Sequence, residues 1–208
     1  MTPRKHARHH LAVLGSAYAA GTIPIAGIAA RITKGIDLRT VGNGTVSGSA
    51  LYDVSGLAPL IAAGCVELTK GAIGPLLAGH DRPLLGATAA ALAITGHNWS
   101  PWLGGKGGRG ISLALGAGLV LGPEATVVLG ASLGIGKLMR RTGTGTFVGL
   151  MALPFVLSRT RGRTGWWTAV LLITPIMVKR LLGNDTSLPR TWSMARWRLI
   201  ADRDESPR

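Results

Sequence analysis

Seven apolar runs divide most of this 208-residue chain, and each is bounded by glycine, proline or charged residues. Runs of this kind are typical of helices that cross a lipid bilayer, and a straight crossing takes about 20 residues. Several runs are shorter, so we expect some helices to be tilted, broken or extended by less apolar flanks. The sequence therefore predicts an all-α fold, a polytopic integral membrane protein with about seven transmembrane helices. The predicted spans are residues 11–31, 54–79, 84–99, 110–122, 124–139, 144–158 and 165–182.

The composition supports insertion into a membrane. The mean hydropathy is +0.33, with 47% hydrophobic and only 15% charged residues, which is too apolar for an ordinary soluble domain. Glycine occurs 31 times without a collagen-like period, as suits helices whose backbones pack closely in a membrane. The single cysteine, Cys65, lies inside the second apolar run, so we expect neither an internal disulfide nor a cysteine-based metal site.

The chain is strongly basic, with a formal net charge of +14. In a soluble protein this charge would suggest nucleic-acid binding. Here the basic residues lie between apolar runs, and the few aromatic residues are not interleaved with them as base-stacking platforms would be. We therefore expect no nucleic-acid partner, because membrane topology and anionic ligands explain the charge better.

The distribution of Lys and Arg among the loops predicts an orientation. With seven spans, the loops 31–53, 97–110 and 137–143 share one face with the C-terminus, and that face carries 15 Lys and Arg residues against 7 on the other. Short basic loops stay in the cytoplasm. We therefore predict a multi-pass protein of the cell (plasma) membrane, with these loops and the C-terminus cytoplasmic. Residues 1–183 are predicted to form one membrane-embedded domain, and residues 184–208 a polar basic tail.

Two glycine-rich loops on this face are the candidate functional segments. Residues 96–110 read GHNWSPWLGGKGGRG, and residues 35–49 read GIDLRTVGNGTVSGS. Glycines let several backbone N–H groups turn toward one anion, and Lys106 and Arg109 add charge that a phosphate accepts. The two loops together point to a phosphorylated substrate handled at the membrane surface. Neither loop has a Walker or dinucleotide-binding pattern, and taken alone each fits a flexible connector equally well.

Three ionisable residues near these loops have two interpretations each. Glu67 and Lys70 lie three residues apart in an apolar run, so on a helix they share a face and neutralise each other. The pair either fixes helix packing, or Lys70 reaches toward a phosphate at the cytoplasmic end. His97 either ends its helix as a hydrogen-bond donor or serves the site, and its sequence neighbours do not support a Ser-His-Asp hydrolase.

A series of short motifs follows along the chain. It consists of Gly21-Thr-Ile-Pro24, Gly35-Ile-Asp-Leu-Arg39, Val41-Gly-Asn-Gly44, Lys70-Gly71, Gly96-His97, Lys106-Gly-Gly-Arg-Gly110 and, more weakly, Lys179-Arg-Leu-Leu-Gly183. In order and spacing this series resembles the PlsY family of membrane glycerol-3-phosphate acyltransferases. The resemblance covers most of residues 15–185, and the ordered series is more specific than any single loop.

The resemblance implies a seven-helix membrane enzyme whose cytoplasmic loops form the active site. It implies transfer of a fatty acyl group from acyl-phosphate to the 1-hydroxyl of glycerol 3-phosphate, giving lysophosphatidic acid for phospholipid synthesis. Acyl-phosphate is already activated, so positioning and charge neutralisation suffice, and we expect neither a metal nor a cofactor. The expected partners are these two substrates and the lipid bilayer, and we expect the protein to act as a monomer.

The resemblance also implies roles for individual residues of this chain. His97, Lys106 and Arg39 are the expected catalytic residues, with His97 orienting a phosphate or the attacking hydroxyl. The residues expected to bind the phosphates and the acceptor are Asn43, Gly44, Thr45, Ser49, Lys70, Gly105, Gly107, Gly108, Arg109 and Arg180.

The chain departs from the family pattern at several polar positions. Members of the family that this chain resembles carry Gly-Ser-Gly-Asn and then Gly-Ala-Thr-Asn. This chain has Gly42-Asn-Gly-Thr45 and Ser47-Gly-Ser-Ala50 at these places. The family's His-Arg-x-x-Asn stretch is replaced by residues 173–178, ITPIMV. These changes leave open a related transferase with another substrate and a catalytically weak paralogue. A small membrane transporter for an anion is the alternative from a different class.

Overall fold

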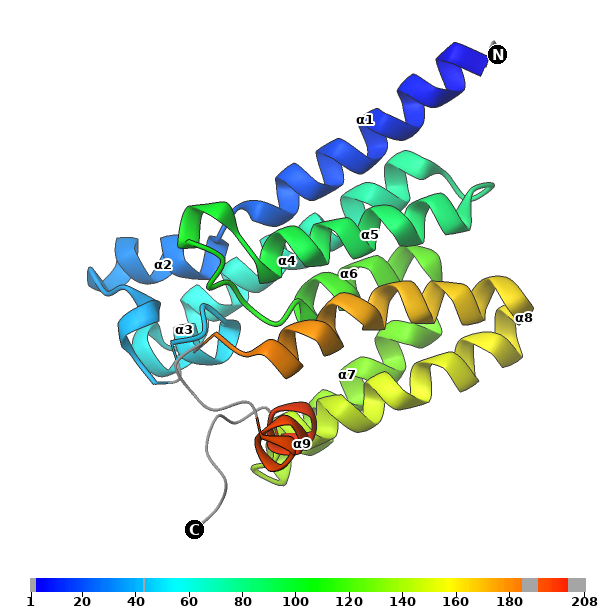
Figure 1. The fold of residues 1–208 in the computed structure, drawn as a ribbon. Coiled ribbons are helices and arrows are strands. Elements are labelled where there is room, and N and C mark those ends of the chain that lie inside the picture. Colours follow the sequence, from blue (N-terminus) through cyan, green and yellow to red (C-terminus); the bar gives the residue numbers. More distant parts are fainter. Residues whose placement is uncertain (1–2, 43, 185–190, 202–208) are drawn as a thin grey trace.

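The computed structural model describes residues 3–42, 44–184 and 191–201, which form helices joined by turns and loops (Figure 1). No strand occurs among these residues, and the predicted all-α class is confirmed. The helices are α1 (Pro3–Thr22), α2 (Ile25–Lys34), α3 (Gly48–Ser55), α4 (Leu57–Ala78), α5 (Pro83–Asn98), α6 (Ile111–Leu121), α7 (Pro123–Leu138), α8 (Thr142–Leu182) and α9 (Trp192–Ala201), with the 3₁₀ turns η1 (Leu38–Thr40) and η2 (Pro101–Leu103).

The helix boundaries follow the apolar runs closely, with one break that the runs do not reveal. Helices α4, α5, α6 and α7 each coincide with one predicted span to within a turn at either end. The first predicted span is broken, because α1 ends at Thr22 and Pro24 lacks the N–H group that a continuous helix needs. The last two predicted spans are the two halves of α8.

Helix α8 is a hairpin of two legs. Gly162, between the legs, has φ 60° and ψ −143°, a backbone conformation that favours glycine. In Figure 1 the first leg runs out to this bend and the second leg returns beside it. The return is tight, because a β-carbon on Gly165 would collide with the carbonyl oxygen of Leu157. At the other end the guanidinium of Arg180 donates to Gly143 O at 3.2 Å, so both ends of the 41-residue element lie together.

The outer surface of the bundle is suited to lipid. Several large apolar side chains are at least 70% exposed, among them Leu11, Ile32, Leu138 and Phe155. Apolar surface of this extent is stable against hydrocarbon rather than against water. Within the described part of the chain, the segments that are long and apolar enough to cross a membrane are Arg4–Lys34, Leu57–Ala78 and Thr142–Leu182. These segments indicate a membrane-spanning protein, and the count of seven spans stays a prediction.

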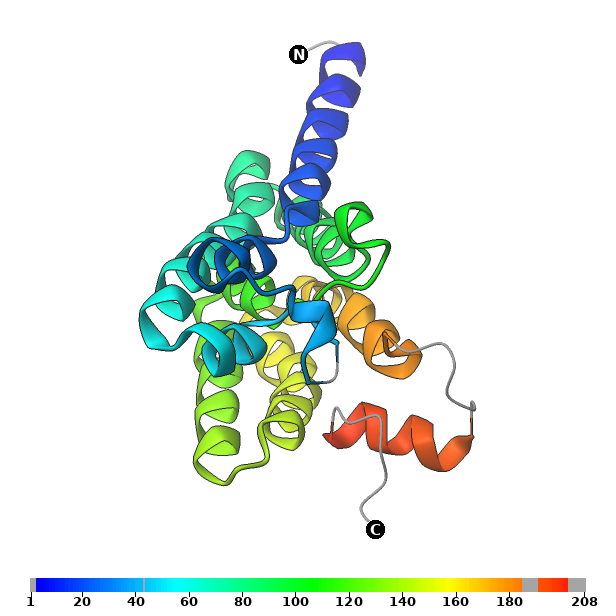
Figure 2. The same ribbon diagram turned by 90° about the vertical axis from the view of Figure 1, so that its left-hand side faces the viewer.

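The connecting segments gather at the two ends of the bundle. One end holds α2, α3, the loop around η2, the end of α8, and α9, which lies across the bundle (Figure 2). The opposite end holds the turns before α5 and α7 and the Gly162 bend, where Arg161 Nε lies 2.6 Å from Glu124 Oε1. The loops that the sequence assigns to one face therefore lie at one end. The cytoplasmic orientation of that end stays a prediction.

Glycines let α4 and α6 approach each other closely. A β-carbon on Gly71 of α4 would collide with the carbonyl oxygen of Leu113, and one on Gly116 of α6 would collide with that of Leu68. The two backbones therefore touch without intervening side chains, as is common for helices packed in membranes. This contact sets the position of α4, which carries two of the buried ionisable residues, Glu67 and Lys70.

We expect Gly71→Ala to destabilise the protein by about 1–3 kcal/mol, because the added methyl group forces two packed backbones apart. Gly64→Ala is the matched control on the same helix, since no atom lies within 4 Å of its β-carbon position. That control should gain up to about 1 kcal/mol from the better helix propensity of alanine. Thermal unfolding in detergent measures both, and equal melting temperatures would contradict the close contact between α4 and α6.

Candidate active site

The break between α1 and α2 is the first element of the candidate site. Because Pro24 ends the helical ladder, the carbonyl groups of Thr22 and Ile23 are available to other elements. The Ser100 hydroxyl donates to Thr22 O at 2.5 Å, and the Lys70 ammonium donates to Ile23 O at 2.6 Å. The break therefore joins the second glycine-rich loop and α4 at one point.

A buried carboxylate links α4 to the end of α5. Glu67 Oε2 lies 2.9 Å from Lys70 Nζ and 3.3 Å from His97 Nδ1. The exposed fractions of these side chains are 6% for Glu67, 5% for Lys70 and 11% for His97. A carboxylate placed in this way neutralises the lysine and fixes the orientation of the imidazole. The other oxygen, Glu67 Oε1, is buried without a hydrogen-bond partner among the described residues.

The opposite edge of the imidazole faces the second glycine-rich loop. A β-carbon on Gly108 would collide with His97 Nε2, and one on Gly107 would collide with the carbonyl oxygen of His97. Only glycine therefore lets the loop pack against the histidine. The narrow cleft at this contact is lined by Thr22, Pro24, Ala26, Val46, Glu67, His97, Leu103 and Gly108. His97 is thus held through Nδ1, while Nε2 lies against Gly108 at the edge of the cleft.

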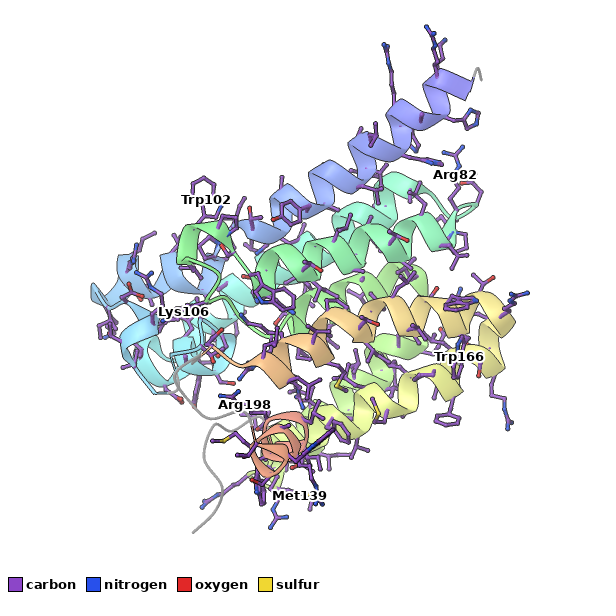
Figure 3. The ribbon with its side chains drawn as sticks, viewed as in Figure 1. Arg82, Trp102, Lys106, Met139, Trp166 and Arg198 are labelled. Atoms are coloured by element: carbon purple, nitrogen blue, oxygen red, sulfur yellow. The ribbon has the colours of Figure 1, made fainter. Side chains whose placement is uncertain are left out.

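Two buried cations tie the loop to the end of α8. Arg109 donates to Lys179 O at 3.3 Å, and Lys179 Nζ donates to Gly105 O at 2.9 Å. The Lys179 ammonium also lies 5.2 Å from the centroid of the Trp99 ring, a cation–π contact. Lys106, between these residues in the loop, is exposed at the same end of the bundle (Figure 3). Positive charge is therefore concentrated along residues 105–109 and immediately behind them.

Arg39 is bound to a neighbouring carboxylate in this structure. Its guanidinium lies 2.6 Å from Asp37 Oδ2, and its backbone N–H donates to Asp37 Oδ1 at 3.0 Å. Arg31 donates to the same carboxylate at 2.8 Å. These bonds, led by that of the Arg39 side chain, hold the pKa of Asp37 well below its usual range, and the pKa of Arg39 is raised in return. Arg39 is exposed, and the structure shows it paired with Asp37.

The remaining predicted site residues do not all lie at the cleft. Thr45 is buried at the junction of the two loops, whereas Ser49 is exposed in the first turn of α3. Asn43 lies outside the described residues. Arg180 is buried but directed elsewhere, because it donates to the carbonyl oxygens of Gly143 and Leu199 and so binds α8 to α9. Its assignment to a phosphate stays a prediction that this geometry does not support.

Sequence reasoning missed Asn184, which joins the two glycine-rich loops. Its Nδ2 lies 3.3 Å from Thr45 Oγ1 in the first loop and 3.2 Å from Gly107 O in the second. No sequence signal marks this residue, since it follows Gly183 at the start of the predicted tail. The sequence predicts Glu67 as the counter-charge of Lys70 and does not reveal its contact with His97, because His97 comes from a different helix.

An apolar groove opens beside the loop, between α5 and the second leg of α8. It has a volume of about 340 Å³ and is lined by Ala91, Thr95, Trp99, Leu171, Thr174, Pro175 and Val178. Trp99 belongs both to this groove and to the cation–π contact with Lys179. The groove and the charged loop therefore meet at one aromatic ring.

These features define an integral membrane protein with an α-helical bundle and, at one end, a narrow cleft that contains Glu67 and His97. The chain belongs to the glycerol-3-phosphate acyltransferase family, whose sequence model matches residues 11–186. It is 32% identical over 200 residues to glycerol-3-phosphate acyltransferase 5 of Dehalococcoides mccartyi, covering 90% of this chain and 85% of that one. It is 31% identical over 166 residues to the glycerol-3-phosphate acyltransferase of Thermus thermophilus, covering 78% and 82% of the two chains.

Solved structures of PlsY, an integral membrane glycerol 3-phosphate acyltransferase, share the fold. The glycerol 3-phosphate form matches with a TM-score of 0.72 at 22% sequence identity, covering 82% of this chain and 88% of that chain. The lysophosphatidic acid form matches with a TM-score of 0.70 at 20% identity, covering 82% and 87%. The membrane-protein fold expected from the motif series is therefore confirmed.

We expect Glu67→Gln to destabilise the protein by about 3–5 kcal/mol, because Lys70 is left as a buried cation without its counter-charge. Adding Lys70→Met removes that cation, so the double variant should recover part of the lost stability, less the contribution of the Lys70 hydrogen bond to Ile23 O. Thermal unfolding in detergent measures the difference. If the double variant is no more stable than Glu67→Gln alone, the two side chains are not coupled as their 2.9 Å separation indicates.

Proposed function

We propose that this protein transfers a fatty acyl group from acyl-phosphate to the 1-hydroxyl of glycerol 3-phosphate, giving lysophosphatidic acid and inorganic phosphate. The observation that carries the proposal is the His97 imidazole, held by Glu67 through Nδ1 and turned with Nε2 toward a glycine-rich, basic loop. Membership of the glycerol-3-phosphate acyltransferase family supports the choice of acceptor.

The proposed reaction needs one proton acceptor and several cations. His97 Nε2 takes the proton of the 1-hydroxyl while the hydroxyl oxygen attacks the carbonyl carbon of acyl-phosphate, and the Glu67 carboxylate stabilises the resulting imidazolium. The bond between that carbon and the phosphate oxygen then breaks, and phosphate leaves. The cations proposed to neutralise the two phosphates are Lys106, Arg109 and, after release from Asp37, Arg39. The charge of Lys70 is already balanced by Glu67.

The apolar groove supports an acyl donor with a long chain. Its lining is almost entirely apolar, and it begins at Trp99, beside the loop that carries the proposed phosphate ligands. A fatty acyl chain lying along α5 and α8 would keep its carbonyl carbon near that loop. The phosphate end of the donor would then meet Lys106 and Arg109 while the chain stays in contact with lipid.

Removing His97 or Lys106 should abolish most turnover. We expect His97→Ala to lower kcat/KM by at least about 100-fold, through loss of the proton acceptor. Lys106→Ala should lower it by a similar factor, through loss of charge stabilisation. Lys34→Ala is the control, an exposed lysine at the same end of the bundle, and it should keep wild-type rates. The assay follows labelled glycerol 3-phosphate into lysophosphatidic acid in detergent, with thermal unfolding to verify folding.

Two results would overturn the proposal. Wild-type rates in both variants would remove the loop from the site. A folded wild-type protein that yields no lysophosphatidic acid would exclude the reaction, and accumulation of unchanged glycerol 3-phosphate in sealed vesicles would then favour a transporter.

We further propose that the protein resides in the plasma membrane with the site facing the cytoplasm. The predicted loop charges support this orientation. In a Cys65→Ser background, a cysteine replacing the exposed Pro101 should react with a membrane-impermeant maleimide only from the cytoplasmic side. His80→Cys, in the turn at the opposite end, is the matched control and should react only from outside. The reverse pattern would contradict the orientation.

A further inference from the structure

Asn184 carries an unsatisfied acceptor inside the junction of the two glycine-rich loops. The residue is 8% exposed, and its Nδ2 lies within 3.5 Å of Gly44 O, Thr45 Oγ1 and Gly107 O. Its Oδ1 is buried and has no hydrogen-bond partner in the part of the chain that the structure describes. A buried acceptor left in this state costs about 1–3 kcal/mol, so native proteins rarely keep one unless something binds there.

The surroundings of that oxygen select the chemistry of its partner. Gly44 O and Gly107 O already accept from Nδ2 of the same side chain, so the acceptor that lacks a donor in this corner is Asn184 Oδ1. Oxygen acceptors repel a phosphate and attract a hydrogen-bond donor. A neutral hydroxyl group fits this corner, and an anionic group does not.

Positive charge lies a short distance away along the same loop. Arg109 follows Gly107 by two residues, which separates the two Cα atoms by no more than about 7 Å even in an extended chain. A hydroxyl at the Asn184 corner and a phosphate at the cations therefore fit one small phosphorylated polyol. The arrangement orients such a molecule with its hydroxyl groups toward Asn184 and His97.

We propose that Asn184 binds the acceptor substrate and selects for it, with Oδ1 accepting a hydrogen bond from the 2-hydroxyl of glycerol 3-phosphate. This inference rests on the proposed function, which places the 1-hydroxyl at His97 and the phosphate at the cations and leaves the 2-hydroxyl for Asn184. Through Nδ2 the same side chain holds the two loops together. Asn184 thus supplies a carboxamide beside Thr45. Thr45 stands at the loop position where the resembled family pattern has asparagine.

The test compares glycerol 3-phosphate with 3-hydroxypropyl phosphate, which lacks only the 2-hydroxyl. Isothermal titration calorimetry measures binding of each compound, and acyl transfer to each is measured in parallel. The wild-type protein should bind glycerol 3-phosphate about tenfold more tightly, the value of one good hydrogen bond. In Asn184→Ala this preference should fall below about twofold, because the acceptor of that bond is gone.

Asn184→Asp is the second variant. Like Asn184→Ala it loses the Nδ2 donor that joins the two loops, but it keeps an acceptor oxygen, so it should bind both phosphates more weakly and still retain the preference. If Asn184→Ala weakens both compounds equally and leaves the preference intact, Asn184 only joins the loops and the inference is wrong. The inference also fails if the wild-type protein binds the two compounds equally.

The two proposals fail separately. A wild-type protein that binds glycerol 3-phosphate with the expected preference but forms no lysophosphatidic acid would exclude the acyl transfer while supporting the role of Asn184. Acyl transfer with an unchanged preference in Asn184→Ala would exclude the role of Asn184 while supporting the reaction.

Discussion

The arrangement of the candidate site depends on the buried carboxylate of Glu67. An ionised group inside a membrane-embedded bundle is costly unless it is paired, and Glu67 has two partners, Lys70 on its own helix and His97 on α5. Because the carboxylate fixes one edge of the imidazole, the other edge is fixed as well, and the loop at residues 107–108 packs against it. The position of that loop determines where Arg109 and Lys106 lie. The buried charge of Glu67 thus sets the position of the glycine-rich loop through its contact with His97.

Lys70 also donates a hydrogen bond to a backbone carbonyl group at the break between α1 and α2. A helix that breaks near a membrane leaves carbonyl groups that no water satisfies, so another group must donate to them. Pro24 causes such a break. The Ser100 hydroxyl donates to Thr22 O, and Ile23 O accepts from both the Lys70 ammonium and the Ile25 N–H. The side chains that complete the first helix are therefore the ones that locate α4 and the second loop. The buried cation is tolerated because Lys70 is bonded to both Glu67 and Ile23 O.

The helices were predictable from the sequence because each helix that crosses a membrane must itself be long and apolar enough to do so. This holds for α4 to α7, where a run of apolar residues defines both the element and its ends. The break at Pro24 was not predictable in the same way, since Pro75 and Pro175 lie inside helices of this protein without ending them. Whether a proline breaks a membrane helix depends on the neighbours that satisfy the backbone, and these are distant in sequence.

The candidate site was predictable only where its residues belong to contiguous motifs. The order of the motifs led to His97, Lys106 and Arg109. The contact between His97 and Glu67 joins residues from two helices, and the contacts of Asn184 join the end of α8 to two loops. Such contacts arise from helix packing and leave no periodic signal. Arg180 shows the converse, because a residue within a recognised motif is directed at the backbone of Gly143 and Leu199 instead of the cleft.

The position of Lys179 explains why chemistry on a lipid precursor suits this end of the bundle. Its ammonium donates to Gly105 O in the charged loop and lies over the ring of Trp99, which lines the apolar groove. The Trp99 ring therefore separates the charged loop from the apolar groove. A donor with a hydrocarbon chain and a phosphate must cross such a boundary at its reactive carbon. An entirely polar acyl acceptor must stay on the loop side. There its hydroxyl end would meet Asn184 Oδ1, and its phosphate end would meet the cations of the loop.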